Sequence, residues 1–220
     1  MSQPTRRGGL EILHRDRWLI VVDKPAGLPS VPSEGVSGRT CLSEMRKLHD
    51  DVIAVHRLDR ETSGAMLFAR SPEVEQALIE QFRAQRVRKK YLALVRGHPR
   101  EKRGEIDKPI ADLGDHATVG RGGEEALTLW RIVRAVGPAT LIEAEPKTGR
   151  YNQIRLHLMS IGYPLVGERK YARGRGDVAR FKRVALHAWK IGIDHPGTGD
   201  KLNIVCPVAA DLEELMERIG

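Results

Sequence analysis

The chain of 220 residues is poor in aromatic side chains, at 5% of its residues, and it has only two cysteines. So few aromatics disfavour a module that binds single strands by stacking many bases. Cys41 and Cys206 form no Cys-x-x-Cys pair and have no histidine at ligand spacing, which argues against a structural zinc site and a disulfide framework. Apolar runs reach about five residues, whereas a membrane-spanning helix needs roughly twenty. Residues 1–9 also lack the apolar segment of a signal peptide. We therefore expect a cytoplasmic protein without a metal, a disulfide or a membrane partner.

Positive charge, by contrast, is in excess. Lysine and arginine number 37 against 29 acidic residues, which gives a net charge of +8. Such an excess favours a polyanionic partner such as RNA, because phosphate neutralisation supplies most sequence-independent affinity. With 40% hydrophobic residues the chain can also bury a substantial core. We predict a folded protein that binds RNA through phosphates, shape and one or two bases.

The apolar pattern predicts strands interrupted by a few helices, which is typical of the α+β class. Strands or hairpins are expected over residues 10–22, 52–55, 65–69, 91–95, 127–136 with 139–144, and 186–193 with 202–205. Helices are expected over 41–49, from a cap at Ser71 to 85, over 153–161 and over 211–218. Residues 1–9 are expected to form a flexible basic tail, and 10–220 one domain. The stretch 97–124 is expected to be the least structured, either as a substrate-contacting insertion or as a variable surface loop.

Residues 56–64, His-Arg-Leu-Asp-Arg-Glu-Thr-Ser-Gly, place one carboxylate among cationic and hydroxyl side chains between two apolar strands. This polar segment must surface as the connection between the strands, and a connection between rigid strands can aim a side chain accurately. Asp59 is therefore the first candidate for a catalytic residue. The spacing alone is equally compatible with a solvated turn in which Arg57, Asp59 and Arg60 form local ion pairs.

This segment resembles the signature of the RluA-type pseudouridine synthases, enzymes that isomerise uridine in RNA to its C-glycoside. Other segments resemble the family in the expected order: residues 21–28 (Val-Val-Asp-Lys-Pro-Ala-Gly-Leu), 89–91 (Lys-Lys-Tyr), 147–157 (Lys-Thr-Gly-Arg-Tyr-Asn-Gln-Ile-Arg-Leu-His) and 186–188 (Leu-His-Ala). The resemblance runs from about residue 11 to about residue 207. It departs at Asn152, where the family usually has histidine. Because an amide does not titrate near neutrality, we expect no acid-base role at this position.

The resemblance implies a pseudouridine synthase fold, with a bent, mainly antiparallel mixed sheet flanked by helices and loops, and a reaction without a cofactor. It implies that Asp59 is the catalytic carboxylate and that Arg155 is its ion-pair partner, since a buried carboxylate resists ionisation unless a cation pairs with it. It also implies that Tyr91 stacks on the target base and takes part in proton transfer. Arg57 would fill the place of the flipped nucleotide. Further substrate contacts are expected from Leu58, Thr62, Gln153, Leu186, Lys89 and Lys90. Without the resemblance, Tyr91 would be interpreted as a core residue, and Arg57 and Arg155 as surface arginines.

The preferred interpretation is an RNA pseudouridine synthase, consisting of the catalytic domain alone and acting as a monomer on a stem-loop of large-subunit rRNA or tRNA. The alternative is a catalytically silent RNA-binding or RNA-folding protein on the same scaffold. The joint presence of Asp59, Tyr91 and Arg155 disfavours it, because binding alone needs no buried ion pair. A nucleoside hydrolase would need a positioned water and usually a second carboxylate or a metal cluster, and the sequence contains no such constellation.

Overall fold

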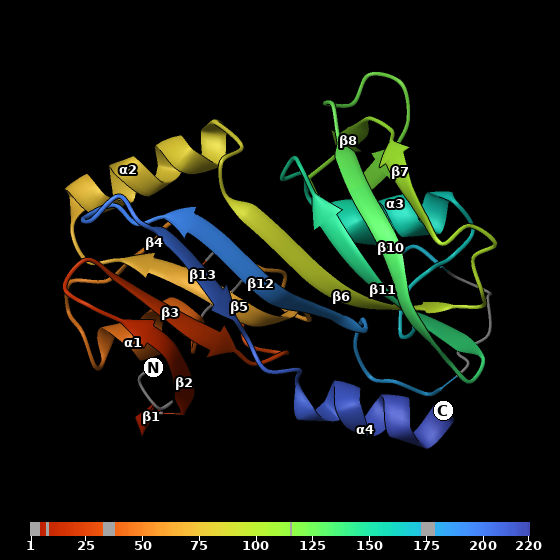
Figure 1. Ribbon diagram of the computed structural model, residues 1–220, viewed down its shortest axis with the longest axis horizontal. Coiled ribbons are helices and arrows are strands. Elements are labelled where there is room, and N and C mark those ends of the chain that lie inside the picture. Colours follow the sequence, from red (N-terminus) through yellow and green to blue (C-terminus); the bar gives the residue numbers. More distant parts are fainter. Residues whose placement is uncertain (1–4, 8, 33–37, 115, 173–178) are drawn as a thin grey trace. The chain divides into compact units, whose positions relative to one another are not determined.

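A computed structural model describes residues 5–7, 9–32, 38–114, 116–172 and 179–220. The chain forms two compact units: the first comprises residues 1–88 with 188–209, and the second residues 89–187 with 210–220. Each unit combines antiparallel strands with a few helices (Figure 1). The predicted α+β class with a mainly antiparallel sheet is therefore confirmed. Among the described helices, none has the length and apolar character that crossing a membrane requires.

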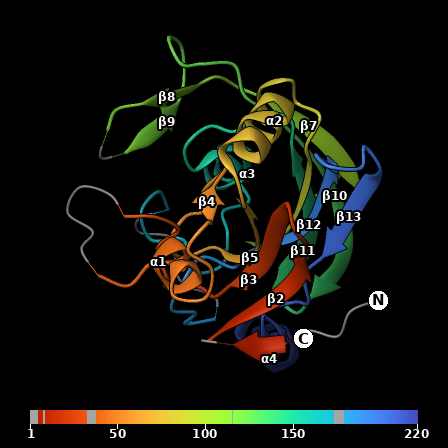
Figure 2. The same ribbon diagram turned by 90° about the vertical axis from the view of Figure 1, so that its left-hand side faces the viewer.

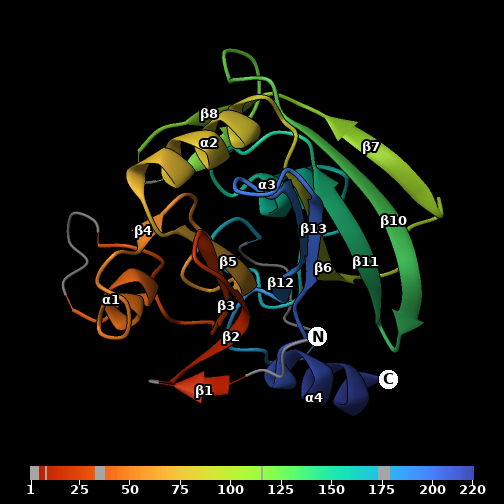
Figure 3. The same cartoon turned by 60° about the vertical axis from the view of Figure 1, so that its left-hand side comes forward.

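The first unit is built around β5, whose seven residues are all buried. It contains β1 (Thr5–Arg7), β2 (Leu10–Arg15), β3 (Leu19–Lys24), β4 (Ile53–Ala54), β5 (Ser63–Ala69), most of β12 (Leu186–Asp194), β13 (Lys201–Val205), α1 (Cys41–Arg46) and α2 (Pro72–Arg83). The strands β1, β2, β3 and β5 pair antiparallel in that order (Figure 3), β4 pairs with β5, and β12 pairs with β13. β12 also lies close to β5: a Cβ added at Gly64 would be only 2.3 Å from the carbonyl oxygen of Ala188.

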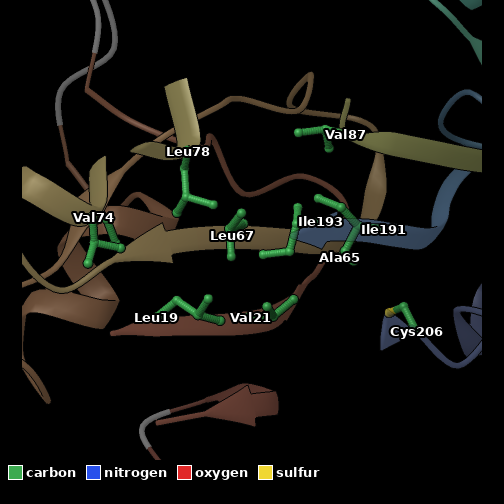
Figure 4. Close-up of a cluster of buried hydrophobic side chains, with 11 residues drawn as sticks. Leu19, Val21, Ala65, Leu67, Val74, Leu78, Val87, Ile191, Ile193 and Cys206 are labelled. Carbon is green, nitrogen blue, oxygen red and sulfur yellow. The ribbon is translucent and has the colours of Figure 1, made fainter. Parts of the chain in front are cut away.

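Helix α2 begins where the sequence predicts. The Ser71 side chain accepts a hydrogen bond from the Val74 amide, and Pro72 occupies the first helical position. The helix ends at Arg83, two residues before the predicted end at Gln85, where the backbone turns to a φ of 55°. Val74 and Leu78 pack on Leu67 in the core of the first unit (Figure 4). Burial of this apolar face fixes α2 against β5.

The second unit contains a four-stranded antiparallel sheet in the order β6, β11, β10, β7. Its elements are β6 (Arg88–Arg96), β7 (Arg103–Asp107), β8 (Ile110–Asp112), β9 (Ala117–Val119), β10 (Leu127–Val136), β11 (Ala139–Pro146), α3 (Gln153–Ser160) and α4 (Ala210–Ile219). Helix α3 packs on β10 and β11 through Ile154 and Leu158, which contact Trp130 and Ile142. The hairpin of β8 and β9 stands outside this sheet and contacts α3 (Figure 2).

The prediction that residues 97–124 are the least structured part of the chain is wrong, because β7, β8 and β9 lie within it. These strands have three to five residues, and Ile106 is the one buried residue of β7, so their apolar pattern is too weak to detect. In the predicted basic tail, residues 5–7 form strand β1, which pairs with β2. Residues 1–4 and 8 of the tail lie outside the described residues. The single domain over residues 10–220 stays a prediction.

Candidate active site

Asp59 lies on the connection between β4 and β5, as the sequence predicts. The Ser30 hydroxyl donates to the Leu58 carbonyl oxygen (2.7 Å) and accepts from the Leu58 amide (2.9 Å). On the other side, the Thr62 amide donates to the Asp59 carbonyl oxygen (3.0 Å). Ser30 and Leu58 are buried. The half-buried Asp59 side chain is therefore carried by backbone that is fastened on both sides.

Lys24 holds the same connection from inside the first unit. Its side chain is fully buried, and its Nζ donates to the carbonyl oxygens of Leu28 (2.8 Å), Pro25 (3.0 Å) and Arg60 (3.4 Å). The Gly27 amide also donates to the Arg60 carbonyl oxygen (2.7 Å). An ammonium group has three donors, so these carbonyls match its hydrogen-bonding capacity. Residues 24–28 therefore support the residue next to Asp59.

The other predicted site residues on this connection differ in accessibility. Arg57 is exposed, so its side chain is accessible for a contact with RNA. Thr62 is 2% exposed, and its Oγ1 has no hydrogen-bond partner within the described part of the chain. An unsatisfied buried hydroxyl is uncommon in folded proteins. Leu58 is buried as well. Substrate contacts from these three residues stay predictions.

Arg155, in the first turn of α3, is buried and held by neighbours from its own unit. Its Nε donates to Oε2 of Glu168 (2.8 Å), and its Nη2 donates to Oε1 of the same carboxylate (2.9 Å). Its Nη1 donates to Oδ1 of Asn152 (3.1 Å). The Tyr171 ring centroid lies 5.2 Å from its Cζ. These contacts fix the plane of the guanidinium group.

Glu168 is itself fixed and ionised. Its side chain is fully buried, and Oε1 accepts the backbone amides of Lys170 (2.9 Å) and Tyr171 (3.1 Å). Burial acts to raise the pKa of Glu168, but the Arg155 guanidinium and the two amides outweigh it, so the pKa is lowered. The carboxylate therefore carries a negative charge beside Arg155 at neutral pH.

Asn152 precedes α3 in the left-handed conformation, with a φ of 53°. Asparagine tolerates this conformation better than most residues. Its Oδ1 accepts from Arg155 while its Nδ2 donates to the Tyr171 hydroxyl (2.7 Å). The amide thus acts as a neutral bridge between the guanidinium and the tyrosine.

β6 carries the segment Lys-Lys-Tyr (residues 89–91), whose side chains point to both faces of the strand. Tyr91 is half-buried and packs on the apolar cluster that contains Ile154 and Leu186. The Lys89 Nζ donates to the Thr148 carbonyl oxygen (3.2 Å), and burial lowers the pKa of Lys89. Lys90 pairs with Glu143 (2.9 Å). Because side chains alternate along a strand, Lys90 points to the face opposite Lys89 and Tyr91. Roles for these three residues in catalysis or substrate binding stay predictions.

A model of the RNA pseudouridylate synthase family matches residues 18–160. The chain belongs to the RNA pseudouridylate synthase family. The matched range contains Lys24, Asp59, Tyr91 and Arg155. The family predicted from the sequence is therefore confirmed.

Named relatives within the family differ in the RNA that their names specify. The chain is 34% identical to the dual-specificity RNA pseudouridine synthase RluA of Pasteurella multocida, over 91% of this chain and 94% of that protein. It is 32% identical to the tRNA pseudouridine synthase C of Haemophilus ducreyi, over 96% of each. It is 37% identical to the ribosomal large subunit pseudouridine synthase D of Nitrosomonas europaea, but spans only 65% of that protein. These relatives are all named pseudouridine synthases, which are isomerases.

The fold also matches that of a solved structure from the family. The human RNA pseudouridylate synthase domain containing 4 is 25% identical in sequence, with a TM-score of 0.82, over 94% of this chain and 92% of that one. This likeness agrees with the family assignment from the sequence.

Gln153 is the first residue of α3, and its side chain hydrogen-bonds to neighbouring segments. Its Nε2 donates to the Leu127 carbonyl oxygen (2.9 Å) and to Thr128 Oγ1 (3.0 Å). Its Oε1 accepts from Thr148 Oγ1 (2.8 Å) and from the Arg150 amide (2.9 Å). These bonds use the full capacity of the amide. A substrate contact, which stays a prediction, would have to replace one of them.

Sequence reasoning missed Ser30 and Glu168, and it gave no role to Lys24. Ser30 lies 28 residues before Leu58, and Glu168 lies 13 residues after Arg155. Neither spacing is a motif, so tertiary contacts alone reveal these partners. The position of Lys24 at the end of an apolar strand does not by itself show that its side chain is buried, since lysine is rarely buried.

Within the described ranges, the one group that could hold a metal ion consists of His14, Asp16 and His195. The Nε2 atoms of both histidines lie 2.8 Å from Oδ2 of Asp16. The Nδ1 of His195 accepts the amides of Gly197 and Thr198 (3.1 Å each), which assigns the ring proton to Nε2. An Nε2 that carries a proton donates to Asp16 and offers no lone pair to a metal. We therefore interpret the group as a hydrogen-bonded triad.

Proposed function

We propose that this chain isomerises specific uridines in structured RNA, of the large ribosomal subunit or of tRNA, to pseudouridine. The proposal is supported by membership of the RNA pseudouridylate synthase family and by relatives whose names specify rRNA, tRNA or dual specificity. The net charge of +8 suits a polyanionic substrate.

The reaction breaks the bond between C1′ of the ribose and N1 of uracil, and then joins C1′ to C5 of the turned base. The proton on C5 leaves to solvent and N1 gains a proton, so atoms balance without a redox change. Asp59 can start the reaction by attacking the sugar or the base, or by removing a proton next to the anomeric carbon. Each route needs Asp59 to be ionised at the start.

In this proposal Arg155 pairs with Asp59 and keeps it ionised, since a nearby cation lowers the pKa of a carboxyl. Tyr91 stacks on the extruded uracil and takes part in moving a proton. Arg57, which is exposed, fills the gap that the flipped nucleotide leaves in the RNA. Leu186 contributes an apolar side chain to the wall of the pocket that holds the uracil.

The observation that carries the proposal is the support of the Asp59 backbone. Ser30 binds the preceding residue, Leu58, at both its amide and its carbonyl, and Lys24 binds the carbonyl of the following residue, Arg60. A solvated turn needs no buried lysine beneath it. Precise placement of a reacting group is what such support provides in enzymes.

The test is the variant Asp59→Asn, which keeps the size of the side chain and removes its charge. Unmodified transcripts of large-subunit rRNA and tRNA, labelled with tritium at C5 of uracil, would release tritium to water as pseudouridine forms. We expect the variant to lose activity by about 100-fold or more, as expected for a positioned catalytic group. Its dissociation constant for the same RNA should change by less than about threefold, because phosphate contacts remain.

The matched control is Asp51→Asn in the same unit. Asp51 is 45% exposed and pairs with Arg70 (3.0 Å) at the surface, so its replacement should leave the rate within about twofold of the wild type. Tritium release by Asp59→Asn at the wild-type rate would overturn the role of Asp59. Tight RNA binding by the wild type with no release from any transcript would favour the alternative, a catalytically silent RNA-binding protein.

A further inference from the structure

We propose that Glu168 is a positioning residue for the isomerisation, which orients Arg155 and balances its charge during the step in which Asp59 becomes neutral. This inference rests on the roles proposed above for Asp59 and Arg155. It concerns a residue outside the segments that resemble the family signature.

The geometry of the ion pair fixes how the Arg155 guanidinium is oriented. Glu168 meets the side of the guanidinium with two parallel hydrogen bonds, 2.8 Å and 2.9 Å long. Two-point contacts of this kind fix the orientation of an arginine as well as its position. The carboxylate is held by the amides of Lys170 and Tyr171, so its own side chain does not need to be ordered by Arg155. Arg155 therefore keeps one orientation whatever the state of Asp59.

Glu168 also balances the charge of Arg155. Arg155 is 7% exposed, and a buried cation without an anion is strongly unfavourable. On each route open to Asp59, its carboxylate becomes neutral, either as an ester or adduct with the substrate or as a protonated acid. The negative charge passes to the uracil at that moment. Glu168 supplies an anion that stays with Arg155 throughout, so the guanidinium is not left uncompensated.

Asn152 completes the arrangement without adding charge. Its amide oxygen accepts from Nη1 of Arg155, and it is fixed by the bond from its Nδ2 to the Tyr171 hydroxyl. Because an amide does not titrate near neutral pH, this contact is the same before and after the chemical step. Glu168 is therefore an anionic partner of Arg155 that the proposed chemical step leaves unchanged.

The experiment compares Glu168→Gln, which removes the charge at equal size, with Glu168→Asp, which keeps it. The rate of tritium release is measured in a single turnover, with excess enzyme, on the transcripts named above, and RNA binding is measured separately. We expect Glu168→Gln to lower the single-turnover rate by about 100-fold, the scale of a misplaced catalytic group. The RNA dissociation constant should stay within about threefold of the wild-type value. The single-turnover rate of Glu168→Asp should be at least about tenfold higher than that of Glu168→Gln.

The matched control is the ion pair of Arg183 and Asp211 in the same unit. Arg183 is also buried, and its Nε and Nη2 each lie 2.7 Å from an oxygen of Asp211. We expect Asp211→Asn to lower the melting temperature and leave the single-turnover rate within about twofold. A structural role of Glu168 would make the Glu168 variants behave like this control.

The outcomes separate the two proposals. If the wild type releases no tritium from any transcript, the proposed function fails. If the wild type is active and folded Glu168→Gln reacts at the same rate, the role of Glu168 is overturned. Should Glu168→Gln fail to fold, Glu168→Asp decides: a fall of about tenfold in rate with unchanged RNA binding supports the role, and an unchanged rate refutes it.

Discussion

The replacement Lys24→Met tests whether the buried lysine supports the connection that carries Asp59. Methionine has a similar length but no donor, so the carbonyls of Pro25 and Leu28, bonded at 3.0 Å and 2.8 Å, lose their charged partner. The Arg60 carbonyl keeps its bond from the Gly27 amide. Hydrogen bonds to charged groups contribute about 1.5–3 kcal/mol each. Since burying a methionine costs less than burying an ammonium, we expect a net loss of about 3 kcal/mol.

For a chain of this size, about 3 kcal/mol corresponds to a fall of about 6–12 °C in melting temperature, measured by circular dichroism. The control is Lys47→Met: the Lys47 side chain is 67% exposed and pairs with Glu44 (2.7 Å). A surface pair of this kind contributes less than about 1 kcal/mol. If Lys24→Met melted within about 2 °C of the wild type, the three carbonyl contacts would not support the connection, and our account of the Asp59 backbone would be refuted.

Two further variants, Gly64→Ala and Asp16→Asn, test the first unit, and Gly162→Ala in the second unit is the control for Gly64→Ala. Gly64→Ala, at a φ of +114° with the Ala188 carbonyl oxygen 2.3 Å from the added Cβ, should yield little folded protein, whereas Gly162→Ala, at +89° with open space around it, should cost about 1–2 kcal/mol. Equal melting temperatures of the two variants would contradict the close approach of β12 to β5. The pKa of Asp16 is lowered from 3.8 to about 2, since burial raises it but hydrogen bonds from two histidines and two amides lower it more. Its stabilisation is therefore present above about pH 4 and lost towards pH 2, so the gap in melting temperature between the wild type and Asp16→Asn should shrink over that range. A constant gap would mean that the carboxylate is not paired in the folded state.

The elements with strong periodicity could be predicted from the sequence. For α2, the start was predicted from the Ser71 cap, the first-turn proline and the apolar face, and the predicted end lies two residues beyond the observed one. The β10 and β11 hairpin follows from two apolar runs around Gly137, whose φ is 51°. The strands β7 to β9 were missed because β8 and β9 have only three residues each and β7 is mostly polar. Tertiary pairing, rather than local preference, makes them strands.

The candidate site could be predicted only where a motif names a residue. Asp59 was placed correctly on the connection between β4 and β5, because a polar segment between apolar strands must surface there. The pairing of Arg155 with Glu168 could not be predicted, since a spacing of 13 residues is no recognisable motif. Asn152 was flagged as a departure from the family, and the structure adds that its amide joins Arg155 to Tyr171.

The buried charges of Lys24 and Glu168 are better explained by function than by folding. Replacing both members of a buried ion pair by apolar residues is often neutral or stabilising, whereas removing one member is strongly destabilising. Folding alone would therefore not favour Glu168 beside Arg155 over a pair of apolar side chains. The same holds for Lys24, whose ammonium is buried to bind backbone carbonyls that a differently folded loop could expose to water. In both places the charge fixes a residue of the proposed site: Glu168 orients Arg155, and Lys24 supports the backbone beside Asp59. If the proposed roles hold, the benefit of that fixation is realised in the reaction.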